Sequence, residues 1–247
     1  MRPPSAADLL GAWEHGLRQP SFLQALALLN AAAPEQAPDA LAGMSIGQRD
    51  ACLLSLRESS FGPQVTGIVT CRACEEQIEL DFDIQQIRAA PPGGGEVPSA
   101  PLSVSASGYE VNFRLPGTRD IALSIHQGDI KATRRALFER CVVSAHHDGS
   151  AVSPTDIPPH LVDVVEARMG EADPQADVRL ALTCSECAFE WEATFDIGTF
   201  LWTELDAWAR RTLFEVHLLA SAYGWREPDV LALSPSRRRF YLEAVSP

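Results

Sequence analysis

Two Cys-x-x-Cys pairs are the residues in this sequence whose types and spacing best suit chemistry. The pairs are Cys71/Cys74 and Cys184/Cys187, and the remaining two cysteines stand alone. In a chain that stays in a reducing compartment, such pairs favour a metal site or redox chemistry over structural disulfides. The sequence therefore directs attention to these four thiols.

Both pairs lie within a repeated stretch of sequence. Residues 68–84 read IVTCRACEEQIELDFDI, and residues 181–197 read ALTCSECAFEWEATFDI. Each copy has an apolar residue, a threonine, the Cys-x-x-Cys pair, a segment of alternating apolar residues and then Phe-Asp-Ile. The repeat predicts two hairpins, each with a strand on either side of its cysteines and a helix after it.

A Cys-x-x-Cys pair at the tip of a hairpin directs two sulfurs at one point. Two such tips that face one another supply the four sulfurs that a tetrahedral Zn²⁺ binds. Cys71 and Cys184 lie 113 positions apart, which fits a pseudo-twofold arrangement with half a site on each hairpin. We therefore expect one structural zinc per chain, on Cys71, Cys74, Cys184 and Cys187.

Two alternatives remain open from the residues alone. A thioredoxin-like redox pair is one, although such a pair belongs at a helix N-terminus and both pairs here lie between predicted strands. The other is that the thiols pack as small apolar side chains without metal. Common zinc knuckles have proline between the cysteines and glycine after the second, whereas this chain has Arg72-Ala73 and Ser185-Glu186, followed by Glu75 and Ala188.

Composition excludes several functional classes. The 247 residues carry a net charge of −13 and a sequence pI near 4.8, which argues against binding nucleic acid or an anionic membrane through the overall field. Lys131 is the only lysine, and no hydrolase, metalloprotease or nucleotide-binding motif is present. We expect no catalytic residues, no small-molecule substrate and, in the absence of a signal peptide or a long apolar run, a cytoplasmic location.

The fold class predicted is α+β, with helices and the two hairpins forming a zinc-ribbon-like centre. Helices are expected over 5–33 (broken at Gln19-Pro20), 46–59, 132–143, 158–169 and 197–223, with strands at 65–70, 76–82, 109–114, 178–183 and 189–195. A turn is expected at 146–149. The segments predicted are an N-terminal helical part (1–40), a helix with the first hairpin (41–90), a Pro/Gly linker (91–102), a strand with helices (103–177) and the second hairpin with C-terminal helices (178–247). Residues 41–247 are expected to form one folded unit.

One stretch resembles a known family. Residues 41–64, LAGMSIGQRDACLLSLRESSFGPQ, lead directly into the first hairpin and resemble the baseplate hub assembly proteins of T-even-type contractile-tailed phages, whose relatives occur with phage-tail-like injection systems. The matching residues are Gly47, Arg49, Asp50, Leu56, Arg57, Phe61, Gly62, Pro63, Cys71 and Cys74. The resemblance extends over about residues 41–245, with a second element at 111–120.

The resemblance implies a non-enzymatic role. Proteins of that family act as assembly factors, or chaperones, or as minor structural parts of the baseplate hub and spike, so the implied partners are hub and spike proteins, in the cytoplasm or in the assembled particle. The alternatives that remain are a zinc-ribbon nucleic-acid-binding protein and a thiol–disulfide redox protein. For Arg49 and Asp50 we favour a salt bridge or cap within the fold over a binding role.

Overall fold

The computed structural model describes residues 3–89, 101–125 and 129–245. It divides into two compact units, one made of residues 1–38 with 197–247 and one made of residues 39–196. Helices and small antiparallel sheets make up the fold, which confirms the predicted α+β class. None of the helices in the described residues combines the length and the apolar character that a membrane span needs.

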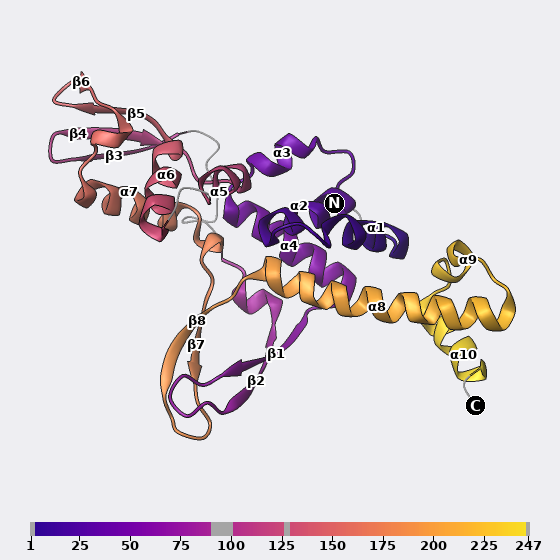
Figure 1. Ribbon diagram of the computed structural model, residues 1–247. Coiled ribbons are helices and arrows are strands. Elements are labelled where there is room, and N and C mark those ends of the chain that lie inside the picture. Colours follow the sequence, from indigo (N-terminus) through magenta and orange to yellow (C-terminus); the bar gives the residue numbers. More distant parts are fainter. Residues whose placement is uncertain (1–2, 90–100, 126–128, 246–247) are drawn as a thin grey trace. The chain divides into compact units, whose positions relative to one another are not determined.

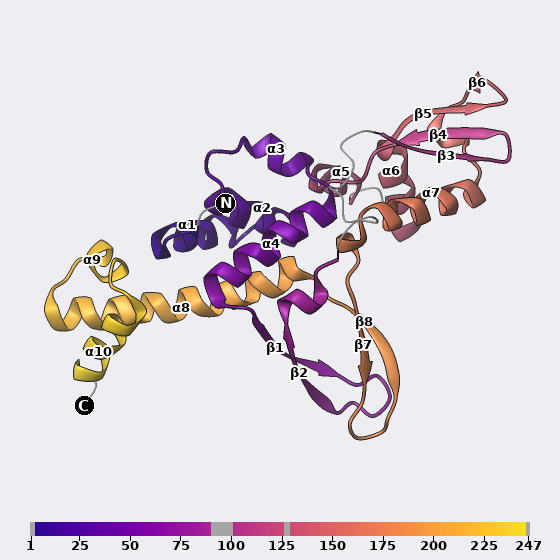
Figure 2. The same cartoon turned by 180° about the vertical axis from the view of Figure 1, so that it is seen from behind.

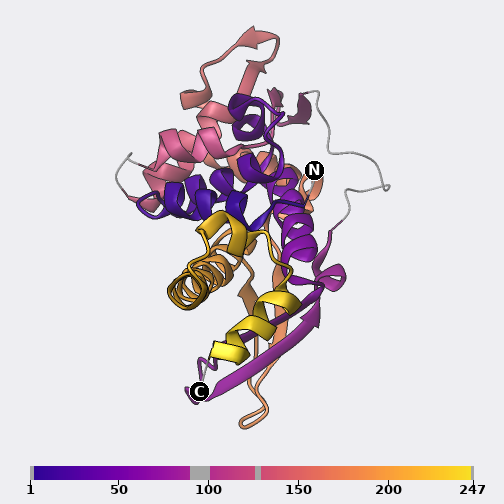
Figure 3. The same ribbon diagram turned by 90° about the vertical axis from the view of Figure 1, so that its right-hand side faces the viewer.

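In the described part of the first unit, the regular elements are all helices. Its elements are α1 (Ala6–Gly16), α2 (Ser21–Ala32), α8 (Ile197–Tyr223), α9 (Glu227–Leu231) and α10 (Pro235–Val245). The helices α1 and α2 pack on α8, where the Trp13 indole N–H donates to the Asp206 carboxylate at 2.9 Å. Gly16 is required by this packing, because a Cβ there would lie 2.4 Å from the Trp202 ring. Figure 3 looks nearly along α8, with α9 and α10 against it.

The second unit begins with helices and the first hairpin. Its first elements are α3 (Pro38–Gly43), α4 (Ile46–Phe61), β1 (Gln64–Thr70), β2 (Gln77–Asp83) and the 3-10 turn η1 (Ile84–Ile87). A capping box begins α4: the Ser45 hydroxyl accepts from the Gln48 N–H, and the Gln48 side chain accepts from the Ser45 N–H. Gly62 ends the helix at a φ of 91°, a conformation that glycine adopts without strain.

A four-stranded sheet with three neighbouring helices follows. The strands β3 (Leu102–Ala106), β4 (Tyr109–Phe113), β5 (Val142–His147) and β6 (Ser150–Ala151) pair antiparallel in that order, with α5 (Thr118–Ser124), α6 (Ile130–Cys141) and α7 (Pro159–Ala172) beside them (Figure 2). Alternate residues of β4 point into an apolar core shared with α6 and α7, whose members are Val111, Phe113, Phe138, Ala145, Ile157, Leu161, Val162 and Val165. The turn expected at 146–149 is shorter than predicted. His146 and His147 belong to β5 and pair with β4 and β6, so only Asp148 and Gly149 form the turn.

The second hairpin closes the unit. The 3-10 turn η4 (Pro174–Ala176) leads into β7 (Arg179–Thr183), and β8 (Glu190–Thr194) pairs with it antiparallel. In Figure 1 this hairpin lies beside β1–β2, and the rings of Phe82 and Phe195 meet edge to face at 5.7 Å between centroids. Both predicted hairpins therefore form, and their inward sides contact one another.

The predicted segment boundaries are not tested by these two units and stay a prediction. All but the last two residues of the Pro/Gly linker predicted at 91–102 lie outside the described residues, and β3 begins at Leu102.

Candidate metal centre

The tips of the two hairpins bring the four paired cysteines together. One ligand atom from each of Cys71, Cys74, Cys184 and Cys187 lies within 4.8 Å of the others. The Sγ atoms of Cys71 and Cys187 are 3.8 Å apart, and those of Cys74 and Cys184 are 3.6 Å apart. The sulfurs therefore approach across the two hairpins.

Local backbone geometry is the same in both tips. The Cys71 N–H donates to the Glu76 carbonyl at 2.8 Å, and the Glu75 N–H donates back to the Cys71 carbonyl at 3.0 Å. In the second tip, Cys184 and Phe189 are joined at 2.9 Å, and Ala188 donates to Cys184 at 3.0 Å. The sequence repeat is thus also a repeat of backbone hydrogen bonding.

The residue after the second cysteine takes a left-handed conformation in each tip. Glu75 has a φ of 61° and Ala188 a φ of 55°. Glycine adopts this region most easily, which explains why common knuckles have glycine there and why its absence stood out in the sequence. The backbone turn of a zinc knuckle forms here without it.

Burial also follows the repeat. The first cysteine of each pair is buried, and the second is exposed. Of the two unpaired cysteines, Cys141 is buried and Cys52 half-buried, and neither belongs to the four-sulfur cluster. Burial raises the pKa of the Cys141 thiol to about 12, so this thiol stays protonated at neutral pH.

The pKa values of Cys71 and Cys74 are shifted in opposite directions. Burial opposes ionisation of Cys71, but the backbone N–H groups of Cys74 and Ala73 outweigh it and lower its pKa to about 7. For Cys74 the Glu76 backbone N–H favours the thiolate, yet the sulfur of Cys187, desolvation and the other two sulfurs raise its pKa to about 12. Four thiolates this close need a compensating cation.

The sulfur separations fit a tetrahedral metal ion. Bonds of about 2.3 Å from zinc to each sulfur place neighbouring sulfurs about 3.8 Å apart. The two contacts between the hairpins, at 3.8 and 3.6 Å, lie at or just below that value. They are far too long for disulfides, whose sulfurs are about 2.05 Å apart. The donor set and its geometry therefore fit a thiolate-binding divalent ion such as Zn²⁺.

A second cluster contains the residues of the family-like stretch at the start of α4. Arg49 and Asp50 form a buried ion pair at 2.7 Å, and Arg49 also donates to the Thr118 hydroxyl at 3.4 Å. The Gly47 N–H donates to the Asp173 carboxylate at 2.9 Å. These residues therefore act within the fold, which confirms the salt bridge expected for Arg49 and Asp50. The part played by Asp173 was not predicted, because nothing in the sequence links it to a glycine 126 positions away.

Stability is expected to depend on pH through Asp50. Burial raises the pKa of its carboxyl from 3.8 to about 6 despite Arg49, and Asp196 and Asp173 add to the increase. The folded chain then holds this proton more tightly than the unfolded chain. The stabilisation that results is complete below about pH 4 and is lost as the pH rises through about 6.

Urea unfolding of the wild type and of Asp50→Asn between pH 4 and 7 measures this contribution. The free energy of unfolding of the wild type, relative to the variant, is expected to fall by about 3 kcal/mol or less over that range. A difference that stays constant with pH would show that Asp50 titrates normally.

Comparison with known proteins identifies the family. A family model described as T4 bacteriophage base plate protein matches residues 24–202. The match begins before residue 41 and ends at residue 202, within α8, so it differs at both ends from the range of the resemblance noted in the sequence. No curated protein and no solved structure matches the chain. Because the matched range contains both hairpins and more than half of the sequence, the chain belongs to the T4 bacteriophage base plate protein family.

Proposed function

We propose that the protein is a non-enzymatic assembly factor or minor structural component of a contractile baseplate hub or spike, with one structural zinc on Cys71, Cys74, Cys184 and Cys187. Membership of the base plate family carries the proposal. The four-sulfur cluster supports a stapling role, since it joins two hairpins that are far apart in the sequence.

The geometry favours a structural metal over catalysis. The cluster offers four cysteine ligands, which would fill all four coordination positions of a tetrahedral zinc. A catalytic zinc instead keeps one position open for water or substrate. A thiol–disulfide enzyme is disfavoured because both pairs lie at hairpin tips rather than at helix N-termini. A nucleic-acid role is disfavoured by the net charge of −13. Work in the cytoplasm during assembly, or as part of the finished particle, is consistent with these features.

Deleting the gene in the organism that encodes it is expected to abolish assembled contractile particles, because an incomplete hub does not support the rest of the baseplate. Electron microscopy of sheath-containing particles from the deletion strain measures this. Supplying the wild-type gene on a plasmid should restore them. A deletion strain with normal numbers of complete, contractile particles would contradict the proposal.

A further inference from the structure

A groove lies between the facing sides of β2 and β7. Its volume is about 590 Å³, and it is lined by residues 79–82 of β2, by η1 and Ala89, and by residues 177–182 leading through β7. The volume falls within the range of about 300–1,000 Å³ that is usual for binding pockets. The groove is thus large enough to hold several side chains.

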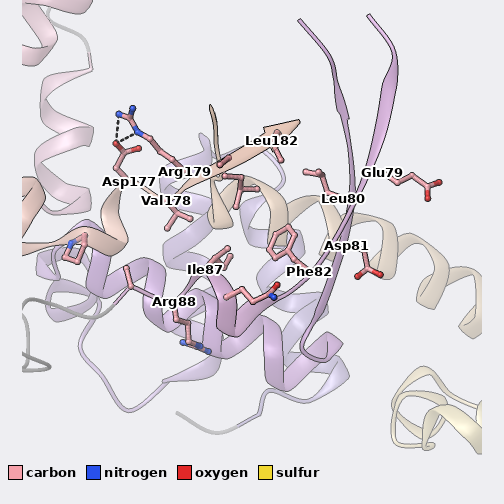
Figure 4. Close-up of a pocket in the computed structure, with 15 residues that line it drawn as sticks. Glu79, Leu80, Asp81, Phe82, Ile87, Arg88, Asp177, Val178, Arg179 and Leu182 are labelled. Atoms are coloured by element: carbon pink, nitrogen blue, oxygen red, sulfur yellow. Dashed lines mark hydrogen bonds and ion pairs between the residues drawn. The ribbon is translucent and has the colours of Figure 1, made fainter. Parts of the chain in front are cut away.

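Apolar side chains form the inside of the groove. Figure 4 shows Leu80 and Phe82 of β2 pointing into the gap from one side and Val178 and Leu182 from the other. Ile87 lies at one end. Alternate residues of β2 thus present an apolar row to the groove.

The strands beside the groove have unpaired edges. In the described part of the chain, β2 pairs only with β1, and β7 pairs only with β8. One edge of β2 therefore offers backbone N–H and C=O groups to another strand. Strand addition at such an edge combines main-chain hydrogen bonds with pockets for alternate side chains.

Charge determines what kind of strand fits. Glu79 and Asp81 are exposed on the outward face of β2 and point away from the groove (Figure 4). Their partners across the hairpin are Ile68 and Thr66, so β1 places no cation opposite them. On β7 the outward Arg179 is already paired, with Asp177 and Glu192. Arg88, which also lines the groove, is paired with Glu58 at 2.8 Å. Among the described residues that line the groove, the charges without an ion-pair partner are therefore the two acids on β2.

We propose that this groove binds an extended segment of a partner protein, as an added strand on β2, in which apolar residues alternate with lysine or arginine. The apolar residues continue the row of Leu80 and Phe82 into the groove. The basic residues lie beside Glu79 and Asp81, where opposite charges on neighbouring strands stabilise the pairing. The inference names the partner type of the proposed function and, in that respect, rests on it.

A fluorescent peptide of alternating valine and lysine, added to the full metal-loaded chain, tests the proposal by anisotropy. The double variant Glu79→Lys/Asp81→Lys is expected to weaken binding about tenfold or more, because it replaces attraction by repulsion at two positions. The matched control Glu190→Lys/Glu243→Lys has the same net charge and changes two exposed acids that do not line the groove. It should bind as the wild type does, once its lower negative charge is allowed for by comparison at several salt concentrations.

Main-chain pairing is tested separately. In an extended peptide the valine N–H groups point to one edge and the lysine N–H groups to the other. Of two further peptides, one N-methylated at the valines and one at the lysines, the peptide whose methyl groups lie on the edge that meets β2 should lose binding. Retained binding of both, equal binding by the two double variants, or no binding of the parent peptide would overturn the proposal. So would binding that appears only after residues 90–100 are deleted, because the chain itself would then be the occupant.

The peptide assay and the gene deletion fail independently. A chain that is required for particle assembly but does not bind the peptide would refute the groove and leave the proposed function intact. A chain that binds the peptide but is dispensable for assembly would refute the proposed function and leave the groove.

Discussion

If the proposed zinc is bound, replacing Cys184 and Cys187 by serine is expected to abolish its binding and to lower the melting temperature of the protein by about 10 °C or more. Structural zinc contributes roughly 10–16 kcal/mol of apparent folding free energy in small zinc-dependent folds. We expect a smaller contribution to the free energy of unfolding here, because the rest of the chain has an apolar core of its own. In a domain of this length, each kcal/mol corresponds to about 2–4 °C. Elemental analysis of protein purified without chelator and differential scanning calorimetry measure the two effects.

Cys52→Ser is the matched control, since this thiol is half-buried on α4 and lies outside the four-sulfur cluster. It should keep one zinc per chain and a melting temperature close to that of the wild type. Thiol counting adds a second readout, because metal should protect four of the six thiols in the wild type. A double variant that keeps both its metal and its melting temperature would refute a site shared between the hairpins.

The same experiment separates zinc from redox chemistry. A thiol–disulfide protein would contain no zinc before the substitution. Its number of free thiols would instead fall on oxidation and return to six on reduction. The sulfur contacts of 3.6 and 3.8 Å run between hairpins rather than within a pair, which is the wrong pairing for a Cys-x-x-Cys disulfide. The crossed arrangement instead suits four ligands around one ion.

The gathering of the four cysteines could be predicted from the sequence because the chain repeats the motif that carries them. Each Cys-x-x-Cys lies between two strands with alternating apolar residues, so hydrophobic patterning alone positions the cysteines at a hairpin tip. The meeting of the tips could be inferred from the need of a metal ion for four ligands. The groove could not be predicted from the sequence. It exists because β2 and β7 lie on the same side of the paired hairpins, and the apolar patterns of the two strands do not specify which strand of each hairpin faces the other.

The elements β3, α5 and β5 were missed, and their stability comes from tertiary contacts. The helix expected over 132–143 ends at Cys141, and its last two predicted residues begin β5. The strand β3 was not predicted, since its alternation of Leu102, Val104 and Ala106 with serines is weakly apolar and follows a Pro/Gly-rich stretch. The short α5 was also not predicted. It depends on Asp120, which accepts two hydrogen bonds from Arg114 at 2.6 and 2.7 Å and one from the Gly117 N–H. By contrast, the long apolar stripe of α8 predicted its bounds, Ile197–Tyr223, correctly.

Gly47, in the family-like stretch, lies where a larger side chain does not fit. Replacing it is expected to destabilise the second unit. A Cβ on Gly47 would lie 2.0 Å from the Asp173 Oδ1 and 2.6 Å from its Cγ. The Asp173 carboxylate is buried, accepts from the Gly47 N–H at the start of α4, and has no hydrogen-bond partner at Oδ1. Gly47→Ala should therefore cost about 2–4 kcal/mol, from overpacking and from loss of this contact at the helix N-terminus.

Urea unfolding of Gly47→Ala beside Gly170→Ala checks this reason. Gly170 lies exposed within α7 with no atom near its would-be Cβ, so alanine there should stabilise by about 0.5–1 kcal/mol through helix propensity. If the clash with Asp173 is the cause, then Asp173→Ala should cost much less in the Gly47→Ala background than alone, because the cap is already lost and the clash is relieved. Additive costs in that double-mutant cycle would mean that Gly47 is required for some contact other than the one to Asp173.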